Sequence, residues 1–276
     1  MCDYVIAYTK MLKLLRDKGF VVISCISWKE QWINCINEHY IPNSKQIFLL
    51  GGDYEYPLEI MDNKLDAIFL RQSFKVSSKK INEILIPSSY GVVAGDINMD
   101  VCEPTDKPKI SFCGSPYTHI SRVYLFKILQ NCQDITCNFI FTDSSCSGNI
   151  DPQIETKKST FTENLRTSEF TFCPRGNGNF SIRFYEALLS GRIPVVVKSD
   201  NEMPFEKYIN WKDYCVVSEN ESTLVQDIIT FHKNNDLNKI QRQCKDIFKE
   251  YFIDKFGILL LTEILNCEAQ INKDII

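Results

Sequence analysis

A turn that carries two glycines, followed by a helix and an apolar strand, constrains this chain more than any other feature. Phe170–Phe172 favours a short strand, and the glycines within residues 175–179 let the backbone bend tightly and approach a ligand closely. A helix is expected to begin after Ser181, to end at Gly191, and to lead into a buried strand, Ile193–Val197. The stretch therefore predicts a strand–turn–helix–strand unit of a parallel sheet.

The chemistry that this unit can support lies at the start of its helix. Free backbone amides and the positive end of the helix at Ser181 favour a bound anion such as phosphate. Arg183 and Glu186 are three positions apart and share one helical face, where they offer an anion binder and an acceptor for hydroxyl groups. These features suggest a nucleotide-sugar site. An ordinary strand–helix–strand unit with a surface arginine and glutamate is the alternative, and the residues alone leave both open.

Composition excludes several other classes of function. The 276-residue chain has a net charge of −4 and no block of basic residues, so nucleic-acid binding is not expected. Its 12 cysteines are scattered without a Cys-x-x-Cys pair and its three histidines lie far apart, which argues against a structural zinc site. We find neither a signal peptide nor an apolar run long enough for a membrane anchor, and we expect a cytoplasmic location.

The order of predicted elements indicates two α/β domains. Strands that alternate with helical stretches are typical of parallel sheets. A segment with two prolines at residues 100–108 separates the halves and is expected to be a linker. We therefore predict an N-terminal domain over residues 1–106, a C-terminal nucleotide-sugar-binding domain over 107–252, and a helix over 253–276 that packs back on the N-terminal domain. The predicted strands lie at residues 4–8, 20–26, 47–50, 67–71 and 84–87, then at 109–113, 137–141, 170–172, 193–197 and 215–217.

Three motifs in the second half resemble those of exostosin-like glycosyltransferases of the GT47 type. Residues 181–188 read Ser-Ile-Arg-Phe-Tyr-Glu-Ala-Leu, and Gly-Arg-Ile-Pro-Val-Val follows from Gly191. Residues 201–205 read Asn-Glu-Met-Pro-Phe, and Gly114 precedes a helical Ser-Arg-Val-Tyr-Leu at 121–125. The resemblance covers roughly residues 108–265 and is weak over the first hundred residues.

The resemblance implies a GT-B fold, in which two Rossmann-like parallel-sheet domains face a cleft. The C-terminal domain is expected to bind the donor and the N-terminal domain the acceptor. The implied activity is inverting transfer of a single hexose or pentose, with xylose favoured, from a UDP-sugar to an oligosaccharide or glycoprotein glycan. We expect no metal and no other cofactor, since the chain has no Asp-x-Asp. A non-catalytic nucleotide-sugar or glycan-binding module derived from the family is the alternative.

The animal relatives of this family are longer, membrane-anchored Golgi enzymes. This chain shows no anchor and has a short N-terminal half. A viral or bacterial enzyme that acts in the cytoplasm is therefore the interpretation that we carry forward.

The family pattern assigns roles in donor binding to residues at matching positions. Arg122 is expected to contact the diphosphate, and Arg183 the phosphates or the donor sugar. Glu186 is expected to accept hydrogen bonds from the ribose hydroxyls, and Glu202 from a donor-sugar hydroxyl. The remaining donor-binding residues belong to the glycine loop and the turn: Gly114, Arg175, Asn179 and Ser181.

The catalytic base is expected on a loop of the acceptor-facing N-terminal domain. Inverting transfer needs a group that takes the proton of the acceptor hydroxyl, and such groups follow the carboxyl ends of parallel strands. Asp53, in a Gly-Gly-Asp-Tyr-Glu loop after an apolar strand, fits best, with Glu55, Glu30 and Asp96 as rivals. Arg71, at the end of the next strand, and Glu55 are predicted acceptor-side contacts.

Overall fold

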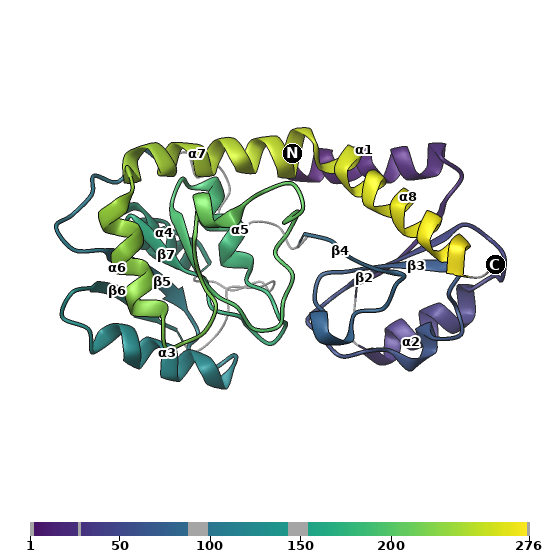
Figure 1. Ribbon diagram of the computed structural model, residues 1–276, viewed down its shortest axis with the longest axis horizontal. Helices are drawn as coiled ribbons and strands as arrows, with labels where there is room; N and C mark the ends of the chain where they lie inside the picture. The colour runs from purple at the N-terminus through teal and green to yellow at the C-terminus, as the bar shows by residue number, and fades with distance from the viewer. Residues whose placement is uncertain (1–2, 27–28, 88–98, 143–153, 275–276) are drawn as a thin grey trace.

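The chain folds into two domains, each built around an all-parallel sheet (Figure 1). The computed structural model describes residues 3–26, 29–87, 99–142 and 154–274. The N-terminal sheet has the order β1-β2-β3-β4, with strands Val21–Ile26, Gln46–Gly51, Ala67–Arg71 and Glu83–Leu85. The C-terminal sheet has the order β6-β5-β7-β8-β9, with strands Thr136–Phe141, Lys109–Gly114, Phe170–Phe172, Ile193–Val197 and Val216–Ser218. The predicted pair of parallel α/β domains is confirmed.

Central strand β2 shows how the N-terminal sheet is buried on both faces. Its side chains alternate between two clusters. Ile47 and Leu49 face the helices α1 (Asp3–Asp17) and α8 (Phe256–Asp274), whereas Phe48 and Leu50 face α2 (Lys29–His39). Every residue of β2 is buried, because helices cover both sides of a parallel sheet. This layering leaves the carboxyl ends of the strands as the place where polar side chains can gather.

The prediction of a strand at residues 4–8 is wrong, because these residues belong to helix α1 (Asp3–Asp17). Its aromatic and β-branched residues favoured a strand. Ala7, Met11 and Leu15, each four positions apart, are buried and pack with the last helix, α8 (Phe256–Asp274). Contact with a helix more than two hundred residues away therefore overrides the local preference.

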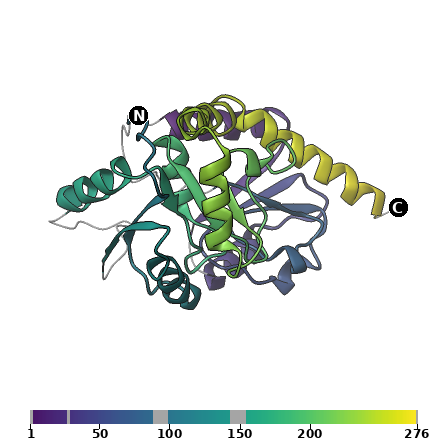
Figure 2. The same ribbon diagram turned by 60° about the vertical axis from the view of Figure 1, so that its left-hand side comes forward.

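The C-terminal domain surrounds its sheet with helices of its own, which Figures 1 and 2 show from two sides. Phe112, Phe170 and Phe172 lie at the centre of its largest apolar cluster. The helices are α3 (Ile120–Gln130), α4 (Ile154–Arg166), α5 (Ile182–Leu189), α6 (Leu224–Asn234) and α7 (Leu237–Lys249).

The last part of the chain crosses back from the C-terminal to the N-terminal domain. Helix α7 and a single π-helical turn, Glu250–Asp254, lead into α8, which lies beside α1 along one side of the molecule (Figure 1). The rings of Tyr8 and Phe256 stack with their centroids 5.6 Å apart. The two ends of the chain thus complete the N-terminal domain together.

The predicted linker is fastened to the C-terminal domain. Arg192 is buried and donates to the carbonyl of Asp100 at 3.1 Å. Gln241 exchanges two hydrogen bonds of 2.8 Å with the backbone of Cys102, and Glu169 accepts from the amide of Thr105 at 2.6 Å. Residues 99–106, predicted to end the N-terminal domain, therefore belong to the C-terminal domain by their contacts.

A glycine at the end of α5 sets how closely α7 packs, and substitution there tests this packing. Gly191 has a φ of 65°, and a Cβ would lie 3.0 Å from the carbonyl oxygen of Gln241 and 2.7 Å from Lys245. Gly19 has a similar φ of 83° with nothing within 4 Å of such a Cβ, so Gly19→Ala is a matched control for strain alone. We expect Gly191→Ala to lower the free energy of unfolding by about 1–3 kcal/mol more than Gly19→Ala in urea denaturation. Equal losses would contradict the close approach.

Candidate functional site

The candidate site lies where the loops at the carboxyl ends of both sheets meet. The loops after β2 and β3 come from the N-terminal domain, and those after β5, β7 and β8 from the C-terminal domain. The amide of Asn179, after β7, donates to Ser73 Oγ, after β3, at 2.8 Å. Parallel sheets place their ligand sites at these strand ends.

The turn at residues 175–180 touches the N-terminal domain through a glycine. A Cβ on Gly178 would lie 3.0 Å from the Cα of Asp53 and 3.1 Å from its carbonyl oxygen. Asn179 is buried, and its side chain donates to the carbonyl of Asp200 at 2.9 Å while accepting from Ser199 Oγ at 2.6 Å. The turn therefore contacts the loop that carries the predicted base, while the side chain of Asn179 anchors it within its own domain.

An ion pair joins a predicted donor-binding residue to a predicted acceptor-side residue. Arg175 Nη2 lies 2.5 Å from Glu55 Oε2, and Lys75 Nζ lies 3.8 Å from the other oxygen of that carboxylate. Glu55 is 6% exposed, and the two cations offset the cost of removing its carboxylate from water.

Arg122 connects two loops of the site through hydrogen bonds and in this sense serves as a tie between them. Its guanidinium donates to the carbonyls of Ser115 and Arg175, both at 2.7 Å, and of Pro174 at 3.1 Å. Burial, and then the nearby charge of Arg183, lowers its pKa to about 10. It fastens the glycine loop to the turn, and the diphosphate contact expected from the sequence stays a prediction.

Arg183 lies over the end of β5. Its guanidinium carbon is 4.3 Å from the centre of the Phe112 ring, and Nη2 donates to the carbonyl of Cys113. Gly114 has a φ of 153°, and a Cβ there would lie 2.9 Å from Arg183 Nη2. A side chain at this position would therefore displace the end of this arginine and strain the backbone. Glu186, one turn further along α5, is buried at 3% exposure.

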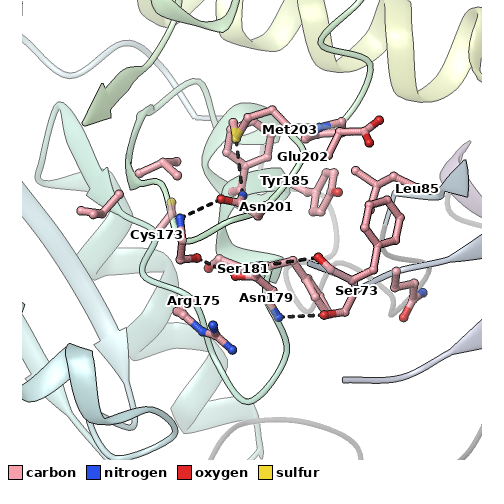
Figure 3. Close-up of a pocket in the computed structure, with 18 residues that line it drawn as sticks. Ser73, Leu85, Cys173, Arg175, Asn179, Ser181, Tyr185, Asn201, Glu202 and Met203 are labelled. Atoms are coloured by element: carbon pink, nitrogen blue, oxygen red, sulfur yellow. Dashed lines mark hydrogen bonds between the residues drawn. The ribbon is translucent and has the colours of Figure 1, made fainter. Parts of the chain in front are cut away.

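A small cavity of about 40 Å³ lies between the two domains. Figure 3 shows Ser73 on one side of it, with Asn179 and Ser181 on the other. Ser181 is the N-cap residue of α5, although its side chain makes no cap hydrogen bond. Glu202 also lines the cavity and forms an ion pair of 2.5 Å with Lys79 of the N-terminal domain.

The structure thus divides seven of the eight predicted donor-binding residues into two groups, while Glu186 is buried on α5 and does not line the cavity. One packs around Phe112 and the other lines the cavity. The first group is Gly114, Arg122 and Arg183, and the second is Arg175, Asn179, Ser181 and Glu202.

Asp53 remains accessible to solvent in the crevice between the domains. The crowding of surrounding protein atoms partly desolvates its carboxyl group and raises its pKa. Among its rivals, Glu55 is held by Arg175, Glu30 is exposed in the first turn of α2, and Asp96 lies outside the described residues. Among the candidates that the structure describes, Asp53 is the one that is exposed beside the turn, and its role as the base stays a prediction.

Arg71 does not reach the site. It is fully buried, pairs with Glu83, and donates to the carbonyls of Tyr54 and Tyr56, both at 2.9 Å. Its guanidinium shapes the loop that carries Asp53 from within the domain. The predicted contact with the acceptor is replaced by this positioning role.

His119 is a site residue that the sequence did not reveal as one, because histidine was weighed there only as a metal ligand. It is the N-cap residue of α3, and its Nδ1 accepts from the amide of Ser121 at 3.3 Å. Burial and the charge of Arg175 lower its pKa, Glu55 opposes them, and Arg122 adds to the lowering. Its place directly before a helix that begins with Ile-Ser-Arg was the signal available in the sequence.

Among the residues that the structure describes, no group of three His, Cys, Asp or Glu side chains is placed to hold a metal ion. None of the helices in this part of the chain is long and apolar enough to cross a membrane.

Replacement of Arg122 tests its role as a tie. Arg122→Met keeps an apolar stem but leaves three buried carbonyls without their donor, so we expect the free energy of unfolding to fall by roughly 2–4 kcal/mol. Arg166→Met removes an exposed arginine that pairs with Glu163 at 3.3 Å, and serves as the control in the same urea titration. Equal stability of the two variants would contradict the structural role.

Comparisons with known proteins find sequence similarity over part of this chain. The Exostosin GT47 domain matches residues 110–230. Exostosin-1 of Bos taurus is 31% identical over 123 residues, which cover 44% of this chain and 16% of that protein. A probable arabinosyltransferase of Arabidopsis thaliana is 21% identical over 243 residues, which cover 84% of this chain and 49% of that protein. The chain thus spans less than half the length of either relative.

A solved structure extends the likeness to the whole chain. A mutant of the Thermobaculum terrenum O-GlcNAc transferase aligns with 100% of this chain and 57% of its own, with a TM-score of 0.52 and 11% sequence identity. At that identity the likeness concerns the fold alone. Together with the two parallel sheets, it confirms the predicted GT-B architecture.

Proposed function

We propose that this chain, in which residues 110–230 form an exostosin GT47 domain, is a glycosyltransferase that moves a sugar from a nucleotide sugar to a glycan acceptor. One observation carries the proposal. The turn at residues 175–180, with Arg175, meets the Asp53 loop of the opposite domain directly. A phosphate-binding turn and a proton acceptor thus face each other across the domain boundary.

The donor in this proposal is a UDP-sugar whose diphosphate lies against the turn. Arg175, Arg183 and the amide groups at the start of α5 supply positive charge there. Such groups stabilise the charge that grows on a departing diphosphate, and they do so without a metal ion. Metal-independent transfer is therefore part of the proposal.

Donor binding also requires movement. A cavity of about 40 Å³ has room for only a few water molecules, and a sugar ring is larger. We propose that the domains separate, or that the turn shifts, when the donor enters. Polar contacts between the domains suit such a motion, because they can be exchanged for contacts with water.

The reaction in this proposal is a single displacement with inversion. Asp53 takes the proton of the acceptor hydroxyl while that oxygen bonds to the anomeric carbon, and the bond from that carbon to the diphosphate oxygen breaks. Partial desolvation raises the pKa of Asp53 and makes the ionised carboxylate a better proton acceptor than an exposed one. Transfer of a single sugar, the choice between hexose and pentose, and the cytoplasmic location stay predictions.

Binding of UDP and UDP-sugars is the first test of the proposal. A ligand that binds only the folded protein raises the melting temperature, so we expect UDP and one UDP-sugar to stabilise the chain in a thermal-shift screen that contains EDTA. Stabilisation by UDP that appears only with Mn²⁺ would contradict metal independence. UDP binding without transfer to any glycan would instead favour a non-catalytic binding module.

Substitution of the proposed base tests the mechanism. Asp53→Asn keeps the size of the side chain and removes the proton acceptor, so we expect kcat to fall by roughly 100-fold or more while the Kd for UDP is unchanged. Glu59→Gln, which alters an exposed carboxylate in the same domain, should leave both values unchanged. Unaltered turnover in Asp53→Asn would remove Asp53 as the base and leave Glu55 as the next candidate.

A further inference from the structure

His119 lies where the two domains and the two predicted donor-binding groups approach one another. It ends the loop after β5 and directly precedes α3, the helix that carries Arg122. The loop and the turn are in contact, because Arg122 donates to the carbonyl of Arg175 at 2.7 Å and a Cβ on Gly176 would lie 3.9 Å from the hydroxyl oxygen of Thr118, the residue before His119. The imidazole therefore lies beside the turn, where Arg175, Arg122 and Glu55 are the charged groups that act on it.

The contacts of the ring determine which nitrogen carries the proton. Nδ1 lies 3.3 Å from the amide nitrogen of Ser121, and a backbone amide can only donate. Nδ1 is therefore the acceptor, and Ser121 Oγ, 2.8 Å from the same atom, is a second possible donor to it. In a neutral imidazole the proton then resides on Nε2, which becomes a hydrogen-bond donor.

The surroundings also favour the neutral ring. Burial and the neighbouring Arg175 lower its pKa below the ordinary value of 6.5, although Glu55 works in the opposite direction. Protonation would place a hydrogen on Nδ1 toward the Ser121 amide and abolish the cap of α3. Electrostatics and hydrogen bonding thus select the same state, a neutral ring with its hydrogen on Nε2.

Histidine is an unusual choice for the helix cap alone. Serine, aspartate and asparagine cap helices more effectively, because a short side-chain oxygen reaches the free amides. His119 performs the same task with Nδ1 and adds a second donor on the far side of the ring. A serine at this position would cap the helix without adding that donor.

We propose that His119 is a donor-site residue whose Nε2–H donates a hydrogen bond to the diphosphate of the nucleotide sugar. This inference rests on the proposed function. The hydrogen bond strengthens as negative charge grows on the leaving diphosphate, and no proton needs to move. His119 thereby adds a neutral, oriented donor to the cationic side chains of the site.

A comparison of UDP with uridine tests the contact, since only UDP carries phosphate. His119→Ser keeps a good helix cap and removes the ring. We expect this variant to bind UDP roughly tenfold more weakly in calorimetry, with uridine affinity unchanged. Unchanged UDP affinity would overturn the proposal, and so would equal losses for UDP and uridine. His119→Asn, another good cap residue, replaces the serine variant if that one does not fold.

The pH dependence of stability provides a second test, which concerns the protonation state of His119. Because the folded protein lowers the pKa of His119, the unfolded chain binds more protons below pH 6.5. The contribution of this group to stability is therefore complete above pH 6.5 and is lost as the pH falls through the folded pKa. We expect part of the acid decrease in melting temperature to disappear in His119→Ser.

An unchanged acid decrease would contradict the neutral, capping state of the ring. Wild-type protein that binds neither UDP nor any UDP-sugar would overturn the proposed function itself. That result differs from intact wild-type binding with an unaffected His119→Ser variant, which would overturn only the role of His119.

Discussion

The contact between the turn at residues 175–180 and the loop after β2 is the constraint on which the site depends. Gly178 has no side chain, so the two backbones can meet at Asp53 without a gap. Arg175 then reaches Glu55 across the boundary, and both charges are largely removed from water. Such a pair is costly to bury unless it is well matched.

Polar contacts also join the domains elsewhere along their boundary, in contrast to the apolar cores within them. Asp200, with a φ of 58°, accepts from the amides of Val76 and Ser77, each at 3.0 Å. Lys79 pairs with Glu202 beside the cavity. Apolar packing, by contrast, ties α8 to α1 and to the N-terminal sheet. The domains are thus joined firmly by the returning chain and loosely at the cleft, a combination that permits opening at the site.

Much of the fold could be predicted from local patterns. Buried β-rich runs such as Ile193–Val197 are read correctly, because an interior parallel strand is apolar on both faces. The helix at residues 4–8 could not be predicted from local patterns, since its conformation depends on contact with α8 at the other end of the chain. The segment at 99–106 was misplaced for a similar reason: its polar composition indicates a loop, but only Arg192 and Gln241 determine which domain holds it.

The sequence by itself determined the residue types of the site and their order along α5, because spacing on a helix follows from its periodicity alone. Only the tertiary structure decided which of these residues act together. It turned Arg122 into a tie between loops, enclosed Arg71 within its domain, and brought His119 beside the turn at residues 175–180. The physical reason is that hydrogen bonds and desolvation depend on neighbours from distant segments, and no local pattern specifies those neighbours.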